Sequence, residues 1–162
     1  MTKCSLLRVY AERTSLYAPE RVIEEAAARH LWQEHPDARQ IARLEEEGLL
    51  RGEVVETERE LPLNLGTGEA EAITLFLAEE ADLLLSDDGR ALRACRLLGI
   101  PFTTTPRVTV DLARRGVIGS GRARQALEKI AVVGRYSRDV IAAALVALQE
   151  IGNEETDDSP TA

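Results

Sequence analysis

Short apolar runs alternate with helical stretches along this chain, and no other feature of the sequence limits its fold as strongly. Four runs have the length and flanking turn residues of buried strands, and they span residues 16–18, 53–56, 82–86 and 100–103. Neighbouring parallel strands need a crossover connection, which is usually a helix. The alternation therefore predicts an α/β fold of three α/β/α layers, with a short parallel sheet covered on both faces.

Cap and breaker residues predict where the helices begin and end. Pro19 stands at the start of the first helix after residues 16–18. An apolar helix opens at Thr67 or Gly68 and runs to residue 81, and a last helix opens at Ser137. Asp37 caps the start of a further helix, and Gly48 ends it. Another helix starts with Thr105 as cap and Pro106 in its first turn, and it ends at Gly116.

The length of 162 residues suits one domain with a core of its own, which we expect over residues 1–152. Residues 153–162 are polar and acidic, so a disordered tail is expected there. No apolar run reaches the roughly 18 residues of a membrane-spanning helix, and no signal-peptide core follows Met1. Cys4 and Cys95 are too few for a disulfide framework. We therefore expect a cytoplasmic protein with no membrane partner.

Acidic residues gather where the predicted sheet would bind a ligand, beyond the carboxyl ends of its strands. Glu24 and Glu25 fall in the helix after residues 16–18, Glu69 and Glu71 open the apolar helix, and Asp87 and Asp88 follow the strand at 82–86. Acids from distant parts of a sequence at one sheet edge suit Mg²⁺ or Mn²⁺, which take carboxylate oxygens and water. Such an ion activates water and neutralises charge on a phosphate.

Each acid taken singly also has a structural explanation. The helix macrodipole favours acids in a first turn, and an aspartate after a strand is a common cap. Glu71 fits this explanation least well, because it lies among Ala70, Ala72, Ile73 and Leu75 on a helix apolar enough to be buried. A buried carboxylate without a partner is costly, so Glu71 is the strongest candidate for a functional acid.

The net charge of −8 is unevenly distributed. Residues 89–138 carry 11 basic and 2 acidic side chains, a net charge of +9, whereas residues 1–88 carry a net −11 and residues 139–162 a net −6. Most of the basic side chains are arginines, whose planar guanidinium suits phosphate. The candidates for binding an RNA backbone are Arg90, Arg93, Arg107, Arg114 and Arg115. Solvated helix faces that balance the acidic remainder are the alternative explanation.

Several motifs together resemble PIN-domain proteins, most closely the prokaryotic branch that includes VapC-like toxins. They cover about residues 5–150 and comprise Pro19, Val22 and Glu25, then residues 68–73 (Gly-Glu-Ala-Glu-Ala-Ile), 83–91, 98–101, 103–105 and 112–118. The resemblance implies a parallel-sheet domain and an endoribonuclease that depends on Mg²⁺ or Mn²⁺. It also implies RNA as substrate, an antitoxin protein as a possible partner, and a homodimer.

Carried over by position, the resemblance assigns catalytic and metal-binding roles to Glu25, Glu71 and Asp87. It adds Asp88 as a neighbouring ligand and Glu69 as an alternative to Glu71. PIN domains open with a strand that carries an essential aspartate, followed by a short helix. Here residues 1–10 already read as that helix, so the strand and its aspartate are missing from the printed sequence.

Two explanations of this departure are open. Either the start codon lies further upstream, or the lineage lost the strand. Loss of a central strand leaves backbone groups of both neighbouring strands unpaired. In the second case the sheet must repair itself by closer pairing of the remaining strands or by dimerisation.

The sequence supports two functions. The first is a metal-dependent ribonuclease, with the toxin of a toxin–antitoxin pair as one form of this function. In such an enzyme the acids hold the ion and the arginines hold the RNA. The second is a catalytically impaired protein of the same fold that binds or assembles with a partner, which the missing aspartate favours. A remoter third function is a phospho-acceptor domain, suggested only by Asp87 and Asp88 after a strand.

Overall fold

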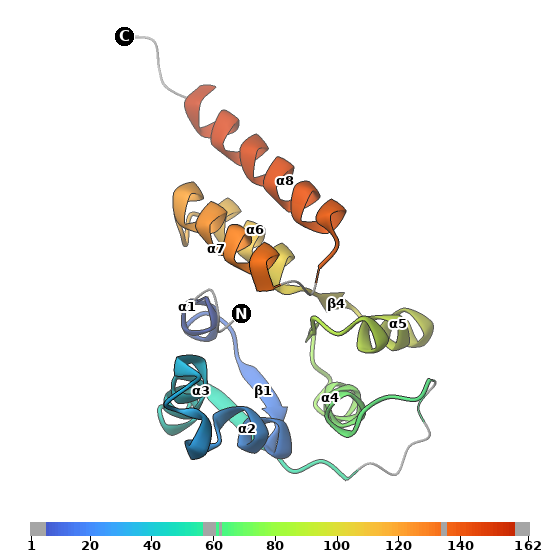
Figure 1. Ribbon diagram of the computed structural model, residues 1–162. Coiled ribbons are helices and arrows are strands. Elements are labelled where there is room, and N and C mark those ends of the chain that lie inside the picture. The colour runs from blue at the N-terminus through green and yellow to red at the C-terminus, as the bar shows by residue number, and fades with distance from the viewer. Residues whose placement is uncertain (1–5, 57–60, 62, 134–135, 158–162) are drawn as a thin grey trace. The chain divides into compact units, whose positions relative to one another are not determined.

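The computed structural model describes residues 6–56, 61, 63–133 and 136–157. These residues form two compact units (Figure 1). Residues 10–103 make up the sheet unit, and residues 6–9 and 104–157 make up the helical unit. The chain passes from the helical unit to the sheet unit within α1 (Leu7–Ala11). That residues 1–152 act as one domain stays a prediction.

The sheet unit confirms the mixed α/β class with parallel strands. Strand β1 (Leu16–Pro19) pairs in parallel with β2 (Leu50–Glu53), and β3 (Leu84–Leu85) pairs in parallel with β4 (Phe102–Thr103). Between the strands lie α2 (Glu20–Ala27), the 3-10 turn η2 (Arg29–Leu31), α3 (Pro36–Glu46), α4 (Thr67–Ala78) and α5 (Gly89–Leu98).

The described strands form two sheets of two strands each, in place of the single sheet expected. No strand precedes β1 among residues 6–15. Closer pairing of β1 with β3, one of the two repairs considered for a missing strand, is therefore not seen in the described part of the chain.

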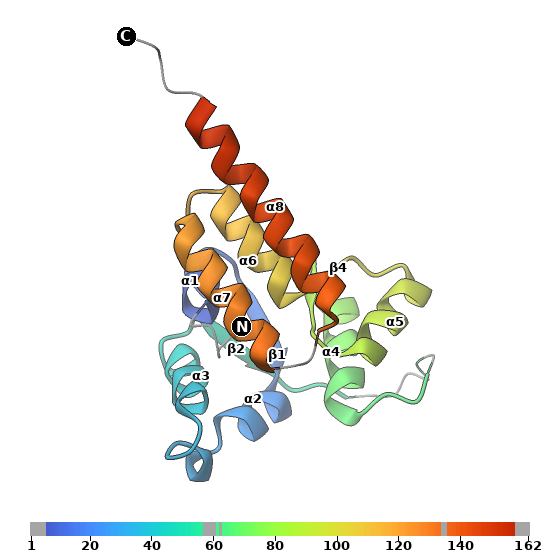
Figure 2. The same cartoon turned by 45° about the horizontal axis from the view of Figure 1, so that its top comes forward.

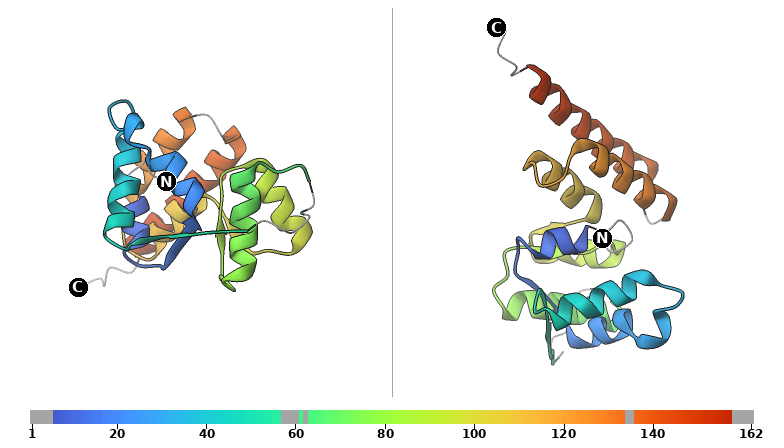
Figure 3. Two further views of the ribbon diagram at one scale, coloured as in Figure 1. Left: turned by 90° about the horizontal axis from the view of Figure 1, so that it is seen from below. Right: turned by 90° about the vertical axis from the view of Figure 1, so that its left-hand side faces the viewer.

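Helix α4 holds the sheet unit together, since it contacts β1, β3 and α5. It is apolar around most of its circumference, as a helix that packs on several sides must be. Ile73 of α4 packs with Leu84, Ala94, Cys95 and Ile100 in a buried core, and α4 lies side by side with α5 (Figure 3). Burial raises the pKa of the Cys95 thiol, as expected for an inert core cysteine.

The position of the second strand and the end of α4 differ from the predictions. The second strand is Leu50–Glu53, so the prediction of a strand over residues 53–56 is wrong except for its first residue. Gly48, at φ +71°, ends α3 and lets the buried Leu50 begin the strand, whereas Val54 is 79% exposed. Helix α4 ends at Ala78, before the predicted residue 81, because Glu80 has a positive φ of 48°.

The helical unit consists of α6 (Thr105–Arg114), α7 (Ser120–Val133) and α8 (Arg138–Asp157), which pack against one another (Figure 2). Pro106 lies in the first turn of α6, as predicted, but the N-cap is Thr104 and the predicted cap, Thr105, is the first helical residue. Helix α8 continues to Asp157, so residues 153–157 of the predicted disordered tail are helical, and residues 158–162 lie outside the described residues. Among the described helices, none has the length and apolar character to span a membrane.

Candidate functional site

Glu71 is the one acidic side chain that the described structure buries, at 7% exposure. Its Oε2 atom lies within the protein without a hydrogen-bond partner. Helical spacing places Gly68, Glu71 and Leu75 along one stripe of α4. A Cβ atom on Gly68 would lie 3.0 Å from Val22 Cγ2, so the N-terminal end of this stripe approaches α2. Glu71 therefore projects from α4 where the helix meets the β1 side of the sheet unit.

A bare carboxylate oxygen in this position requires an explanation. Burial of a neutral polar group without a hydrogen-bond partner costs about 1–3 kcal/mol of folding free energy. Burial of an ionised carboxylate without a compensating partner costs more than that. Proteins offset that cost with an ion pair, a hydrogen bond, a metal ion or a change of protonation. The burial of Glu71 makes its carboxylate a candidate ligand for a cation.

Glu69, two residues earlier, has a structural role in the described protein. Its Oε2 accepts a hydrogen bond from the backbone N–H of Gly66 at 2.6 Å, which closes the N-terminus of α4. Its Oε1 accepts a hydrogen bond from Nη2 of Arg90 at 3.2 Å. Both oxygens are thus engaged by groups of the protein itself.

Asp88 caps the N-terminus of α5. Its Oδ1 accepts hydrogen bonds from the backbone N–H groups of Arg90 at 2.7 Å and Ala91 at 3.1 Å. The Ala91 N–H, followed by that of Arg90, holds the pKa of Asp88 below its usual 3.8 against the opposing effect of burial. Its own backbone N–H donates to Ser86 Oγ at 3.2 Å, so the turn after β3 is fixed at both ends.

The remaining two predicted ligands lie in different settings. Asp87 is half-buried and follows β3 in the turn that leads into α5. Because α4 contacts β3, Asp87 and Glu71 come from adjacent elements. Glu25 is exposed on α2 and forms a 3.2 Å ion pair with Arg21 one helical turn away.

The structure therefore brings together Glu69 and Asp88, which Arg90 bridges, and not Glu25, Glu71 and Asp87. Among the described residues, no three His, Cys, Asp or Glu side chains are grouped closely enough to hold a metal ion. The oxygen chemistry of Glu71 suits a divalent cation, and Asp87 follows β3, a strand that α4 contacts. The roles of all five acids in metal binding stay predictions.

The predicted RNA-binding arginines divide between the two units. Arg90 and Arg93 are exposed on α5 of the sheet unit. Arg107, Arg114 and Arg115 are exposed on α6 and at its C-terminal end in the helical unit. Each unit therefore carries exposed arginines of its own.

Sequence reasoning missed the link through Arg90, which joins the starts of α4 and α5. Its Nη2 reaches Glu69 at 3.2 Å and its Nε lies 4.0 Å from Asp88. The capping signals were present in the sequence, as a glutamate at the third position of one helix and an aspartate just before the other. Nothing in the spacing of 21 residues between Glu69 and Arg90 indicated their contact.

A family model described as a PIN domain matches residues 2–150. No curated protein and no solved structure matches the chain.

Proposed function

The chain belongs to the PIN-domain family, whose fold is of the nuclease type, and from this premise we propose that it is a divalent-metal-dependent endoribonuclease. The family match spans residues 2–150 of 162 and supports the class of chemistry. What we propose beyond the family is the divalent metal, the RNA substrate and the residues that act on the RNA.

The observation that carries this proposal is the buried, unpartnered Oε2 of Glu71. Evolution tolerates a buried uncompensated carboxylate poorly, because it lowers stability in a molecule with only about 5–15 kcal/mol to lose. A hard cation such as Mg²⁺ or Mn²⁺ satisfies such an oxygen, and Asp87 on the adjoining turn supplies a second. Glu71 and Asp87 are therefore the proposed core of the site, with Glu25 as a further candidate.

Each group has a defined task in the proposed reaction. A bound divalent ion lowers the pKa of water and neutralises charge on a phosphodiester. Glu71 and Asp87 offer carboxylate oxygens to the ion, Glu71 from α4 and Asp87 from the turn after β3. Exposed arginines neutralise backbone phosphates of the RNA and so hold it against the protein.

The experiment is cleavage of a labelled single-stranded RNA with and without Mn²⁺, by the wild-type chain, Glu71→Gln and Glu128→Gln. Glu128 is an exposed glutamate on α7 and gives a matched control for the loss of one charge. We expect Mn²⁺-dependent cleavage by the wild type and by Glu128→Gln, and a rate lower by a factor of at least 10² for Glu71→Gln. Equal rates for all three proteins would contradict the role of Glu71.

A second function is favoured by a specific observation. Since no group of three potential ligands is formed among the described residues, the site by itself has fewer ligands than a metal nuclease generally needs. A catalytically impaired protein that binds or assembles with a partner fits that observation. Absence of any Mn²⁺-dependent cleavage by the wild-type chain would favour it over the nuclease. We also propose an antitoxin protein as a partner of the chain and a homodimer as its assembly.

A further inference from the structure

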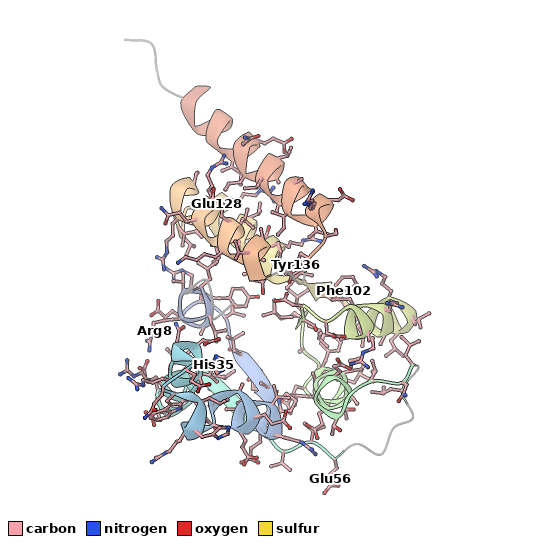
Figure 4. All side chains as sticks on the ribbon, viewed as in Figure 1. Arg8, His35, Glu56, Phe102, Glu128 and Tyr136 are labelled. Atoms are coloured by element: carbon pink, nitrogen blue, oxygen red, sulfur yellow. The ribbon has the colours of Figure 1, made fainter. Side chains whose placement is uncertain are left out.

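A pocket of about 300 Å³ lies at the amino-terminal ends of the parallel strands β1 and β2, within the sheet unit. Its lining comes from residues 11–16, which lead into β1, and from Gly48, Leu49 and Arg51, where α3 is followed by β2. A Cβ atom on Gly48 would have no atom within 4 Å, so the pocket is open at that turn. Glu56, labelled in Figure 4, follows the carboxyl end of β2. The pocket is thus at the end of the strand pair opposite to the one where the sequence predicts the metal site.

The polar side chains of the lining are mostly hydrogen-bond donors. Arg13 and Arg51 each contribute a guanidinium, and Thr14 and Ser15 each contribute a hydroxyl. Glu12 is the one acid of the lining, so two arginines against one glutamate leave a net charge of +1. A planar guanidinium offers pairs of N–H groups that match the oxygens of a phosphate, and hydroxyl groups donate to such oxygens as well. This set of side chains favours a small anion that carries a phosphate group.

Arg51 is the arginine of the lining that is better placed to bind an anion. Nη1 of Arg13 lies 3.6 Å from Oε2 of Glu12, so part of the Arg13 charge is offset within the lining itself. Arg51 is exposed, and the ion pairs formed among the described residues do not include it. Its Cζ atom lies 5.8 Å from the centroid of the Tyr17 ring. The charge of Arg51 is therefore available to a ligand that enters the pocket.

Tyr17 adds an aromatic surface beside the pocket. Tyr17 and Arg51 are partners in the register of β1 and β2, so their side chains share one face of the strand pair. Leu50, the residue before Arg51, is buried on the other face, whereas the Tyr17 ring is 38% exposed. Nucleobases stack on exposed rings of this kind. A ligand with both a phosphate group and a planar base is a nucleotide, and pockets for small molecules begin at roughly the volume observed here.

We propose that this pocket binds the terminal phosphate group of a nucleotide, with Arg51 as its main partner and with the base stacked on Tyr17. The hydroxyl groups of Thr14 and Ser15 donate to the phosphate oxygens, and Glu12 weakens binding by repulsion. The nucleotide is either a free nucleoside monophosphate or the phosphorylated 5′ end of an RNA strand, since both present the same groups. The pocket uses none of the acids of the proposed metal site, so this inference does not depend on the proposed nuclease activity.

The test is an NMR titration of the full chain with EDTA present, so that no metal ion contributes to binding. The probe is adenosine 5′-monophosphate (AMP), and we expect it to shift the amide signals of Ser15 and Arg51. Arg51→Ala is expected to weaken AMP binding by roughly tenfold, as the loss of a charge-assisted hydrogen bond does. Arg43→Ala is the matched control, because Arg43 is an exposed arginine of α3 outside the lining, and it should bind AMP like wild type. Glu12→Gln removes the repulsion and should bind AMP about threefold more tightly.

A short RNA with and without a 5′-phosphate distinguishes the two sources of the nucleotide. Tighter binding of the phosphorylated RNA than of AMP assigns the pocket to RNA ends, and equal or weaker binding assigns it to the free nucleotide. The gain expected for Glu12→Gln separates the inference from misfolding, because a damaged fold does not bind more tightly. Three results would overturn the inference: neither millimolar AMP nor the phosphorylated RNA shifts Ser15 or Arg51, Arg51→Ala binds AMP as tightly as Arg43→Ala, or Glu12→Gln binds AMP no more tightly than wild type.

Discussion

At the scale of single residues, Glu71 departs most from what a stable fold requires. It has 7% exposure and an oxygen without a partner, in a stripe that approaches Val22 of α2. Part of this was predictable, because a glutamate flanked by alanine, isoleucine and leucine has no exposed helix face to occupy. The burial of Glu71 could thus be inferred from the sequence. The lack of a hydrogen-bond partner could not, because partners come from elements distant in the chain.

Replacing Glu71 by glutamine is predicted to stabilise the protein in the absence of metal. The substitution keeps the shape of the side chain and removes a buried charge, and a neutral amide costs less to bury than an uncompensated carboxylate. We expect the free energy of unfolding to rise by roughly 1–3 kcal/mol in urea with EDTA present. Glu128→Gln, on the surface, is expected to stay within about 0.5 kcal/mol of wild type. A loss of stability in Glu71→Gln would mean that the carboxylate is paired within the folded protein.

At the scale of elements, the cap of α5 is the clearest stabilising feature. Asp88 accepts two backbone N–H groups that the helix itself leaves unpaired. We predict that Asp88→Ala lowers the free energy of unfolding by about 1 kcal/mol, measured by urea denaturation at pH 7. Asp88→Asn keeps an acceptor oxygen and serves as the control, with a smaller loss. Equal stability of Asp88→Ala and wild type would show that the cap contributes nothing.

The pH dependence of this cap has a definite sign. The pKa of Asp88 is lower in the folded protein than its usual 3.8, because the N–H groups of Ala91 and Arg90 favour the ionised form. The contribution of Asp88 is therefore complete above its usual pKa and is lost as the pH falls through the folded value. We expect the stability difference between wild type and Asp88→Asn to be constant from pH 7 to 5 and to shrink below pH 4. A difference that grows on acidification would contradict this.

The sequence predicted the order of elements better than their extents. Strands β1, β3 and β4 lie within their predicted ranges or overlap them. The helix starts predicted at Pro19 and Ser137 agree with the observed starts of α2 and α8. The second strand was misplaced because the valines at 54 and 55 have high strand propensity, whereas the actual position is set by the turn at Gly48 and the burial of Leu50. Tertiary burial outweighed local preference at this point.

At the scale of the whole molecule, the basic block of residues 89–138 divides between two units. The net charge of this block could be counted from the sequence. Its division between two units could not be predicted, because the division depends on how α6 packs with α7 and α8. The single predicted sheet is likewise two sheets, since pairing is a property of segments far apart in the chain. The α/β class survives both differences, because it follows from the alternation of helices and strands alone.

Binding of RNA by the helical unit is predicted to depend on salt through the arginines of α6. Arg107 is exposed on that helix, and Arg115 is exposed at the residue that follows it. If both contact phosphates of single-stranded RNA, the double variant Arg107→Ala, Arg115→Ala lowers the slope of log K against log salt by about 1.4, at roughly 0.7 per phosphate. Fluorescence anisotropy from 50 to 200 mM KCl measures the slope. An unchanged slope would remove these two arginines from the interface.

The central claim is that Glu71 is buried to hold a divalent cation, and calorimetric titration of Mn²⁺ tests it most directly. The wild-type chain, Glu71→Gln and Glu128→Gln are titrated under one set of conditions. The account predicts that wild type and Glu128→Gln bind Mn²⁺ with the same affinity and that Glu71→Gln binds it at least tenfold more weakly. Binding of Mn²⁺ by Glu71→Gln as tightly as by wild type, or no binding by wild type, would contradict the account.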